Sequence, residues 1–101
     1  MKYRVFTEIR IIGRLLFDYL MRHPALEHFI DYKKTLDRYC PGRCDWRVYL
    51  NNGSEFIFAP PYPRIDNGVH YDKYVEYDSY HNCPLDILLL VIEEVCKEEG
   101  T

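Results

Sequence analysis

The sequence predicts an α+β domain with the element order ααβββα: an αα-hairpin, a three-stranded antiparallel β-sheet and a C-terminal helix. Three observations lead to this fold class. They are a β-hairpin pattern over residues 45–59, helical periodicity over residues 8–39, and an apolar helical segment that begins at Pro84. With 101 residues, the chain is expected to be a single domain, residues 1–101, that buries roughly 65% of its unfolded surface.

The first thirty-nine residues carry the predicted αα-hairpin. Residues 2–6 are short and apolar, and form either an extended lead-in or the start of a helix. From Glu8 to about Arg22, apolar residues recur at helical spacing. His23-Pro24 then breaks the helix, because the residue before a proline is excluded from the helical region. A second helical stripe follows as far as Tyr39, so the two helices are expected to form a hairpin.

The central segment is the predicted β-hairpin. Trp46, Val48 and Leu50 alternate with more polar neighbours, and Asn52-Gly53 favours a two-residue turn before a return strand over residues 55–59. This turn would place Trp46 opposite Ala59 and Val48 opposite Ile57. Both faces of the hairpin would then be largely apolar, so we expect helices or a second copy of the chain to cover them.

The remaining elements are a third strand and a final helix. Prolines keep residues 60–63 extended, and a turn at Asp66-Asn67-Gly68 leads into a strand over about residues 69–77. The final helix begins at Pro84, and its apolar residues cover more than half of its circumference. One sheet face cannot cover so wide an arc. The helix is therefore either sandwiched between the sheet and the αα-hairpin, or part of it belongs to an oligomer interface made by Ile87, Leu90 and Val91.

The charge distribution suggests an alternative surface. The net charge is −3, but residues 1–50 carry +4 and residues 51–101 carry −7. If the fold separates the two halves, the N-terminal half presents a basic face that could bind nucleic acid, with tyrosines as stacking surfaces; otherwise the charges intermingle. The candidate nucleic-acid-binding residues are Arg10, Arg14, Arg22, Lys33, Lys34, Arg38, Arg43 and Arg47.

The cysteines and acidic residues were considered as chemical sites. In an oxidising compartment or a hyperthermophile, Cys40 or Cys44 could form a disulfide with Cys83 or Cys96. A zinc site from Cys40, Cys44, His81 and Cys83 has unfavourable spacing. A strand carrying His70, Asp72, Glu76 and Asp78 on one face would hold a divalent metal for phosphodiester hydrolysis only if it bends. Because no catalytic motif is present, we expect no cofactor, no resident metal and no enzymatic activity.

Composition adds one resemblance. The absence of glutamine is one mark of a thermophilic source. Small size, ten tyrosines, four cysteines and the lack of a recognisable motif together resemble the small orphan proteins of viruses of hyperthermophilic archaea. The resemblance implies a thermophilic viral source and a place in the host cytoplasm, and it assigns no functional residue. No signal-peptide pattern is present, and the longest apolar run, Ile87–Ile92, is too short to span a bilayer. We therefore expect a cytoplasmic protein with no membrane partner.

These observations predict a small non-enzymatic interaction or structural protein that acts through surface contacts as a homodimer. We also expect a protein partner besides the second copy of the chain, and the sequence does not identify it. Nucleic-acid binding through the basic N-terminal half is the alternative function.

Overall fold

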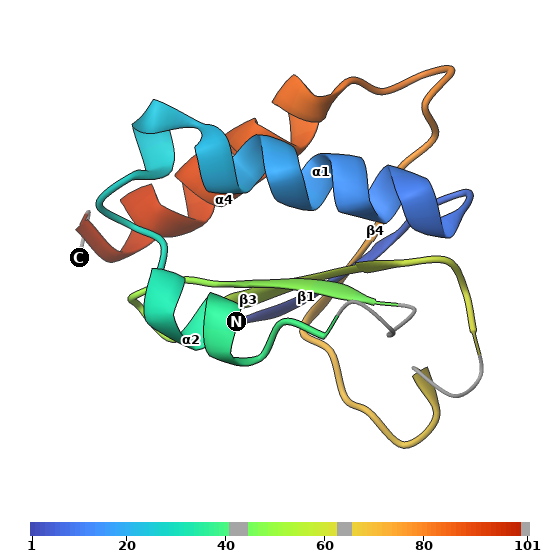
Figure 1. The fold of residues 1–101 in the computed structure, drawn as a ribbon, viewed down its shortest axis with the longest axis horizontal. Helices are drawn as coiled ribbons and strands as arrows, with labels where there is room; N and C mark the ends of the chain where they lie inside the picture. The colour runs from blue at the N-terminus through green and yellow to red at the C-terminus, as the bar shows by residue number, and fades with distance from the viewer. Residues whose placement is uncertain (41–44, 63–65, 100–101) are drawn as a thin grey trace.

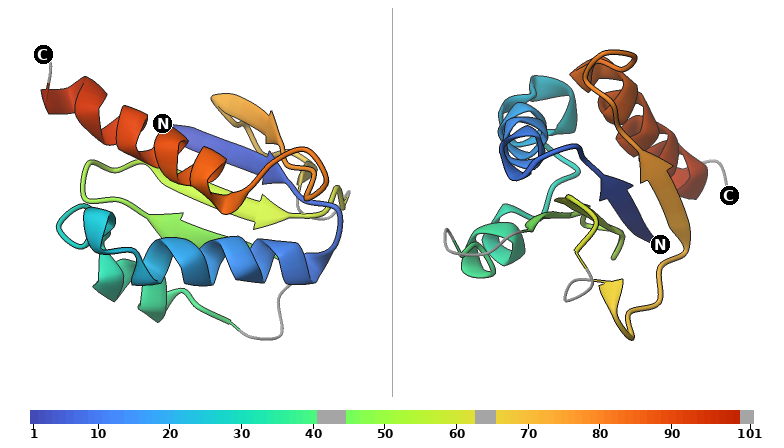
Figure 2. Two further views of the ribbon diagram at one scale, coloured as in Figure 1. Left: turned by 90° about the horizontal axis from the view of Figure 1, so that it is seen from above. Right: turned by 90° about the vertical axis from the view of Figure 1, so that its right-hand side faces the viewer.

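The computed structural model describes residues 1–40, 45–62 and 66–99, and consists of a four-stranded sheet with helices α1 and α4 on one face (Figure 1). Figure 2 shows the same two helices side by side above the sheet. The elements, in chain order, are β1 (Lys2–Phe6), α1 (Arg10–Arg22), the 3₁₀ helix η1 (Pro24–Leu26), α2 (Tyr32–Asp37), β2 (Trp46–Tyr49), β3 (Glu55–Ala59), β4 (Lys73–Glu76) and α4 (Pro84–Glu99).

The predicted three-stranded antiparallel sheet in the order ααβββα is wrong. The sheet is mixed, with the strand order β2-β3-β1-β4, and only β2 and β3 are antiparallel. Its additional strand is β1, which lies between β3 and β4 and is parallel to both. The partners of β1 are distant in the chain: Lys2 aligns with Glu55, and Tyr3 with Lys73. Such pairings leave no local sequence pattern, which is why residues 2–6 could not be assigned from the sequence.

The αα-hairpin is only half present. Helix α1 forms where it was expected, but the predicted second helix is replaced by η1 and the six-residue α2. Between them, the chain runs along the edge of the sheet: Ile30 forms a bridge with Leu50, and the amide of Asp31 donates to the carbonyl of Tyr49 at 2.9 Å. Asp31 then caps α2 by accepting from the Lys34 amide at 3.0 Å. Pairing with the sheet has therefore overridden the helical pattern.

The β2–β3 hairpin is present, but its register differs by one residue from the prediction. Trp46 aligns with Phe58 and Val48 with Phe56, because the loop has three residues, 51–53, in place of two. The third loop residue, Gly53, has φ +90°, a conformation that glycine adopts without a steric cost. The shift moves Phe56 and Phe58 to the face that carries Trp46 and Val48, so the aromatic residues point toward the helices.

Helix α1 approaches this aromatic layer closely. A Cβ atom added to Gly13 would lie 3.1 Å from the carbonyl oxygen of Phe58 and 3.1 Å from the ring of Trp46. Leu16, Leu20 and other residues one turn apart continue the contact along the helix. The absence of a side chain at residue 13 therefore sets the distance between α1 and the sheet.

The second face of the sheet is covered by the β3–β4 connection. The connection passes from β3 across β1 to β4, in the opposite direction to the β1–β3 connection that contains α1. Right-handed crossovers in opposite directions lie on opposite faces, and the connection runs beneath the sheet in Figure 1. Tyr71 in this connection is 4% exposed. The underside of β1 thus obtains its cover from an irregular segment, whereas the underside of β2 is covered at Tyr49 by side chains of α2.

Candidate interaction surfaces

The outer face of the helix layer carries exposed apolar side chains. On α1, Ile11 and Leu15 are 58% and 55% exposed, and on α4, Leu85 and Leu89 are 49% and 55% exposed. Each pair is spaced four residues apart, so each forms a stripe opposite the buried side of its helix. Because α1 and α4 lie side by side on one face of the sheet, the two stripes belong to the same side of the molecule (Figure 2). We call these four residues the helix-layer patch.

The predicted oligomer-interface residues lie elsewhere on α4. Ile87 and Val91 are 2% and 0% exposed, and belong to the core between α4 and the sheet. Leu90 is half-buried and packs against the same core. The apolar arc of α4 is therefore split, with one side facing the sheet and the other, at Leu85 and Leu89, facing outward.

A shallow groove adjoins the patch at the C-terminal half of α1. It has a volume of about 380 Å³ and is lined by Leu15, Asp18, Tyr19, Arg22, His23 and Pro24. Leu15 belongs to both the groove and the patch, so the two features are continuous. The His23 ring completes the end of the groove, where its Nδ1 accepts a hydrogen bond from the Ala25 amide at 3.2 Å. An apolar side chain with a charged group beside it would fit this groove.

The two helices carry opposite charge. Helix α1 contains Arg10, Arg14 and Arg22 against a single Asp18, giving a net charge of +2. Helix α4 contains five acidic residues and Lys97, giving −4. Asp18 is also 3.8 Å from the guanidinium Nε of Arg14, so it is partnered within its own helix.

The structure separates the predicted basic residues into groups. Arg10 and Arg14 lie over the Trp46 ring, with centroid distances of 5.5 and 6.0 Å, on the helix side of the sheet. Arg22 is at the far end of α1, in the groove. Lys33 is exposed on α2, and Arg43 lies outside the described residues. The single basic face that the sequence suggested is therefore divided between both sides of the sheet.

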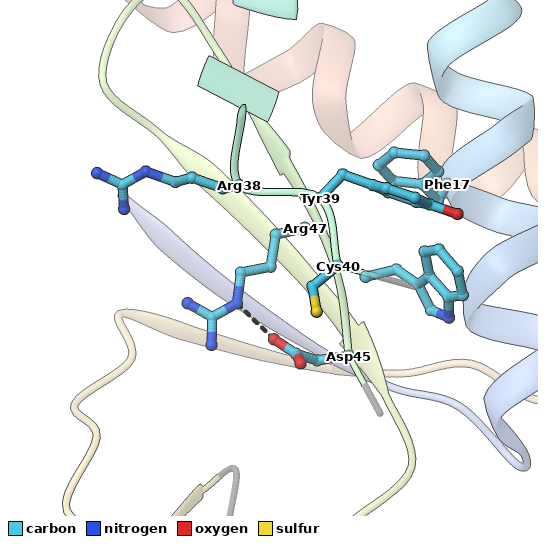
Figure 3. A pocket seen from close by; sticks show the side chains of 7 residues that line it. Phe17, Arg38, Tyr39, Cys40, Asp45 and Arg47 are labelled. Atoms are coloured by element: carbon cyan, nitrogen blue, oxygen red, sulfur yellow. Dashed lines mark hydrogen bonds and ion pairs between the residues drawn. The ribbon is translucent and has the colours of Figure 1, made fainter. Parts of the chain in front are cut away.

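The second group surrounds Tyr49 on the other side of β2. Lys34 and Arg38 lie over the Tyr49 ring, at 4.8 and 5.3 Å from its centroid. Arg38 and Arg47 extend toward the same side in Figure 3, away from the Phe17 and Tyr39 rings. Neither Lys34 nor Arg38 forms an ion pair with an acidic residue in the described part of the chain.

Arg47 is the exception in this group, because its charge is compensated. Its Nε lies 2.5 Å from Asp45 Oδ2. Burial alone would lower the pKa of Arg47, but the hydrogen bond and charge of Asp45 outweigh burial and raise the pKa. The uncompensated positive charge around Tyr49 thus comes from Lys34 and Arg38.

Neither a small-molecule pocket nor a metal cluster stands out among these residues. The cavity between Tyr39, Asp45 and Arg47 has a volume of about 10 Å³, which is room for about one water. In residues 1–40, 45–62 and 66–99, no three His, Cys, Asp or Glu side chains are grouped as a metal would require. Asp72 instead accepts from the Lys2 amide at 2.7 Å, and Asp78 pairs with His81 Nδ1 at 2.7 Å.

The predicted disulfide has no counterpart among the described cysteines. Cys40, Cys83 and Cys96 are free and exposed thiols, and Cys44 lies outside the described residues. The same part of the chain also has no helix with the length and apolar character that a bilayer span requires.

Two buried polar groups were not anticipated from the sequence. Arg4 is fully buried on the underside of β1, where its Nε donates to Asp66 Oδ1 at 2.7 Å. Glu94 of α4 is 5% exposed and accepts hydrogen bonds from the Tyr3 hydroxyl and from Ser54 Oγ, the latter at 2.7 Å. The α-amino group of Met1 lies 3.9 Å from the same carboxylate. Both groups connect distant segments, which makes them structural anchors.

The titration behaviour of Glu94 follows from these contacts. Burial alone would raise the pKa of Glu94, but the hydrogen bonds from Tyr3 and Ser54 and the nearby positive charges leave it below its ordinary value. Burial and the bond to the Glu94 carboxylate raise the pKa of Tyr3, which keeps its hydroxyl proton available for donation. The pair is therefore a phenol donating to an ionised carboxylate.

Comparison with known proteins gives no further assignment. No protein-family model matches the chain, and neither a curated protein nor a solved structure matches it.

The sequence did contain a signal for the helix-layer patch. Ile11 and Leu15 lie outside the main apolar stripe of α1 and are themselves four residues apart, which indicates a second apolar side. No comparable signal marks Arg4, whose acidic partner is 62 residues away.

Proposed function

We propose that this protein is a non-enzymatic interaction protein that works as a homodimer through the outer face of its helix layer. The observation that carries the proposal is the helix-layer patch: four apolar side chains, each about half exposed, on two adjacent helices. Exposed apolar stripes on one face of a protein are characteristic of protein–protein contact sites. The groove beside Leu15 supports the same surface, because it provides a concave complement to an apolar side chain.

The test is Leu89→Glu. Because Leu89 is 55% exposed, a carboxylate there reaches water in the monomer and leaves the fold intact. In the dimer it would be desolvated twice, once for each copy, and we expect dimer affinity to fall by at least about 100-fold. Sedimentation velocity from about 5 to about 500 µM measures the change.

The matched control is Leu36→Glu on α2, since Leu36 is 59% exposed and lies outside the helix layer. It should dimerise like the wild type, and far-UV circular dichroism should be unchanged for both variants. A wild-type chain that stays monomeric over the whole range, or a Leu89→Glu variant that remains dimeric, would contradict the proposal.

Nucleic-acid binding is a second candidate function, supported by the cluster of Lys34 and Arg38 over Tyr49. Two cations without acidic partners on one ring provide local positive potential for a phosphate backbone, although the chain as a whole is acidic. Compared with the eight residues expected from the sequence, this candidate site is smaller and lies on the underside of β2.

The double variant Lys34→Glu/Arg38→Glu tests this candidate. Fluorescence anisotropy with single-stranded and duplex DNA and RNA at low salt should show weaker binding, with a salt slope reduced by about 2. Lys73→Glu/Lys97→Glu is the control, because it changes the net charge equally at exposed residues on β4 and α4. An equal loss of affinity in both double variants would indicate non-specific electrostatic attraction. If the wild type does not bind nucleic acid, this candidate function is wrong.

A further inference from the structure

We infer that the two copies of the homodimer are related by a two-fold axis parallel to α1 and α4, so that α1 of each copy lies on α4 of the other. This inference rests on the proposed homodimer and specifies its geometry. Two directions of a two-fold axis in the plane between two helix layers keep the helices of both copies aligned: along the helices and across them. The first choice places α1 on the partner's α4, and the second places α1 on α1 and α4 on α4.

Charge distinguishes the two arrangements. With the axis across the helices, α1 at +2 would face another α1, and the exposed carboxylates Asp86 and Glu93 of α4 would face those of another α4. Like charges in contact oppose association, whereas the axis along the helices pairs the basic helix with the acidic one twice. The charges therefore favour the arrangement in which α1 packs on the partner's α4.

The order of residues along the two helices gives a second, independent argument. The outer stripe of α1 reads Ile11, Leu15, Asp18, Arg22, and that of α4 reads Leu85, Leu89, Glu93, Cys96. Both stripes begin apolar and end polar, and both helices run in the same direction along the sheet (Figure 2). An axis along the helices preserves that direction, so apolar halves meet each other and polar halves meet each other. A fully overlapping antiparallel contact would instead lay Leu15 and Ile11 against charged residues.

The register follows from matching the apolar pairs. When Ile11 and Leu15 lie beside the partner's Leu85 and Leu89, the partner's Leu89 reaches the groove that Leu15 lines. Glu93, one turn further along α4, then lies between Asp18 and Arg22 of the other copy. Asp18 is paired with Arg14 of its own helix, so Arg22 is the cation that Glu93 meets. Both side chains are exposed in the monomer, so they are available to pair.

The size of the contact sets the expected affinity. Helix α1 has 13 residues and is about 20 Å long, and two neighbouring helices span a width of about 20 Å. The resulting footprint of roughly 400 Å² per copy is about half that of a standard interface. We therefore expect a dissociation constant in the micromolar range, where changes in either direction can be measured.

The experiment uses charge reversal in trans. Arg22→Glu alone should place two acidic groups together in each contact, and Glu93→Arg alone two basic groups, so each variant should dimerise at least about tenfold more weakly than the wild type. Mixing the two variants should produce a heterodimer in which both contacts are again between opposite charges. We expect its affinity to return to within about threefold of the wild-type value. Sedimentation equilibrium, or native mass spectrometry of an isotope-labelled mixture, measures this recovery.

A matched pair controls for net charge. Lys33→Glu and Glu27→Arg change the same charges at exposed residues outside the helix layer, and their mixture should behave like the wild type. If the two test variants dimerise normally, or if their mixture is no stronger than either alone, the α1-on-α4 arrangement is wrong. The response of the dimer to Leu89→Glu remains a separate result, so the arrangement can fail while the homodimer stands. A wild-type monomer at all concentrations would remove both.

Discussion

Arg4 shows how completely a single buried charge can be satisfied. Its guanidinium has five N–H groups, and it makes five hydrogen bonds: two to Asp66, and one each to the carbonyl oxygens of Val5, Ala59 and Pro60. These partners come from β1, from the end of β3 and from the connection beneath the sheet. Arg4 therefore fastens the β3–β4 connection to the central strand, and it has no donor left for a ligand.

We expect Arg4→Lys to destabilise the protein although it conserves the charge. An ammonium offers three donors in place of five and cannot bind Asp66 in the same two-point geometry, so buried carbonyl oxygens lose their partners. The free energy of unfolding should fall by about 2–4 kcal/mol, measured by urea denaturation. Arg22→Lys, at an exposed position, is the control and should change stability by less than about 0.5 kcal/mol. Equal stability of the two variants would mean that Arg4 does not anchor the connection.

Predictability from sequence differs among individual residues for a physical reason. The N-terminal turn of α4 was predictable, because Pro84 and Asp86 act on their neighbours: the Asp86 carboxylate accepts from the Cys83 amide at 2.9 Å. Arg4 and Glu94 were not predictable, because their partners are 40 to 91 residues away. For the same reason, the exposed candidates Ile11 and Leu15 carried a local signal and the buried anchors did not.

At the scale of elements, local sequence patterns predicted whether a segment is a helix or a strand better than they predicted which strand it pairs with. Helices α1 and α4 and the β2–β3 hairpin formed where periodicity indicated, but the register of the hairpin depended on one additional loop residue, Asn51. The second predicted helix failed because the backbone at Ile30 and Asp31 pairs with β2. Hydrogen bonds available at the sheet edge therefore outweighed the local helical pattern.

The strand β1 determines the architecture and was the element least visible in the sequence. It supplies a central strand of the sheet, and it requires two crossovers, one that places α1 on one face and one that places an irregular connection on the other. Because that connection and α2 cover the underside, the hairpin needs no second copy on that face. The outer side of the helix layer remains apolar and open at Ile11, Leu15, Leu85 and Leu89.

At the scale of the whole molecule, Glu94 links the last helix to the first and third strands. Its contacts with Tyr3 and Ser54 hold the C-terminal half of α4 against the end of the sheet at which β1 and β3 begin. The hydrogen bonds from Tyr3 and Ser54 and the nearby positive charges favour the ionised form of this carboxylate. The attachment of α4, and with it the shape of the helix layer, should therefore depend on pH.

The sign of that dependence follows from the lowered pKa of Glu94. The stabilisation is fully present above the unfolded-state pKa of about 4.3, and it is lost as the pH falls through the lower pKa of the folded state. At pH 7, Glu94→Gln should lower the free energy of unfolding by about 1–3 kcal/mol. The reason is that the NH₂ group of the new amide is a donor and would face the hydroxyls of Tyr3 and Ser54, which donate to the carboxylate in the wild type. Below about pH 4 the difference from the wild type should shrink, since the wild-type carboxyl becomes neutral as well. Urea denaturation at pH values from about 7 to about 3 measures the convergence, with the exposed Glu27→Gln as the control. A constant difference across this range would show that the ionised form of Glu94 does not hold α4 on the sheet.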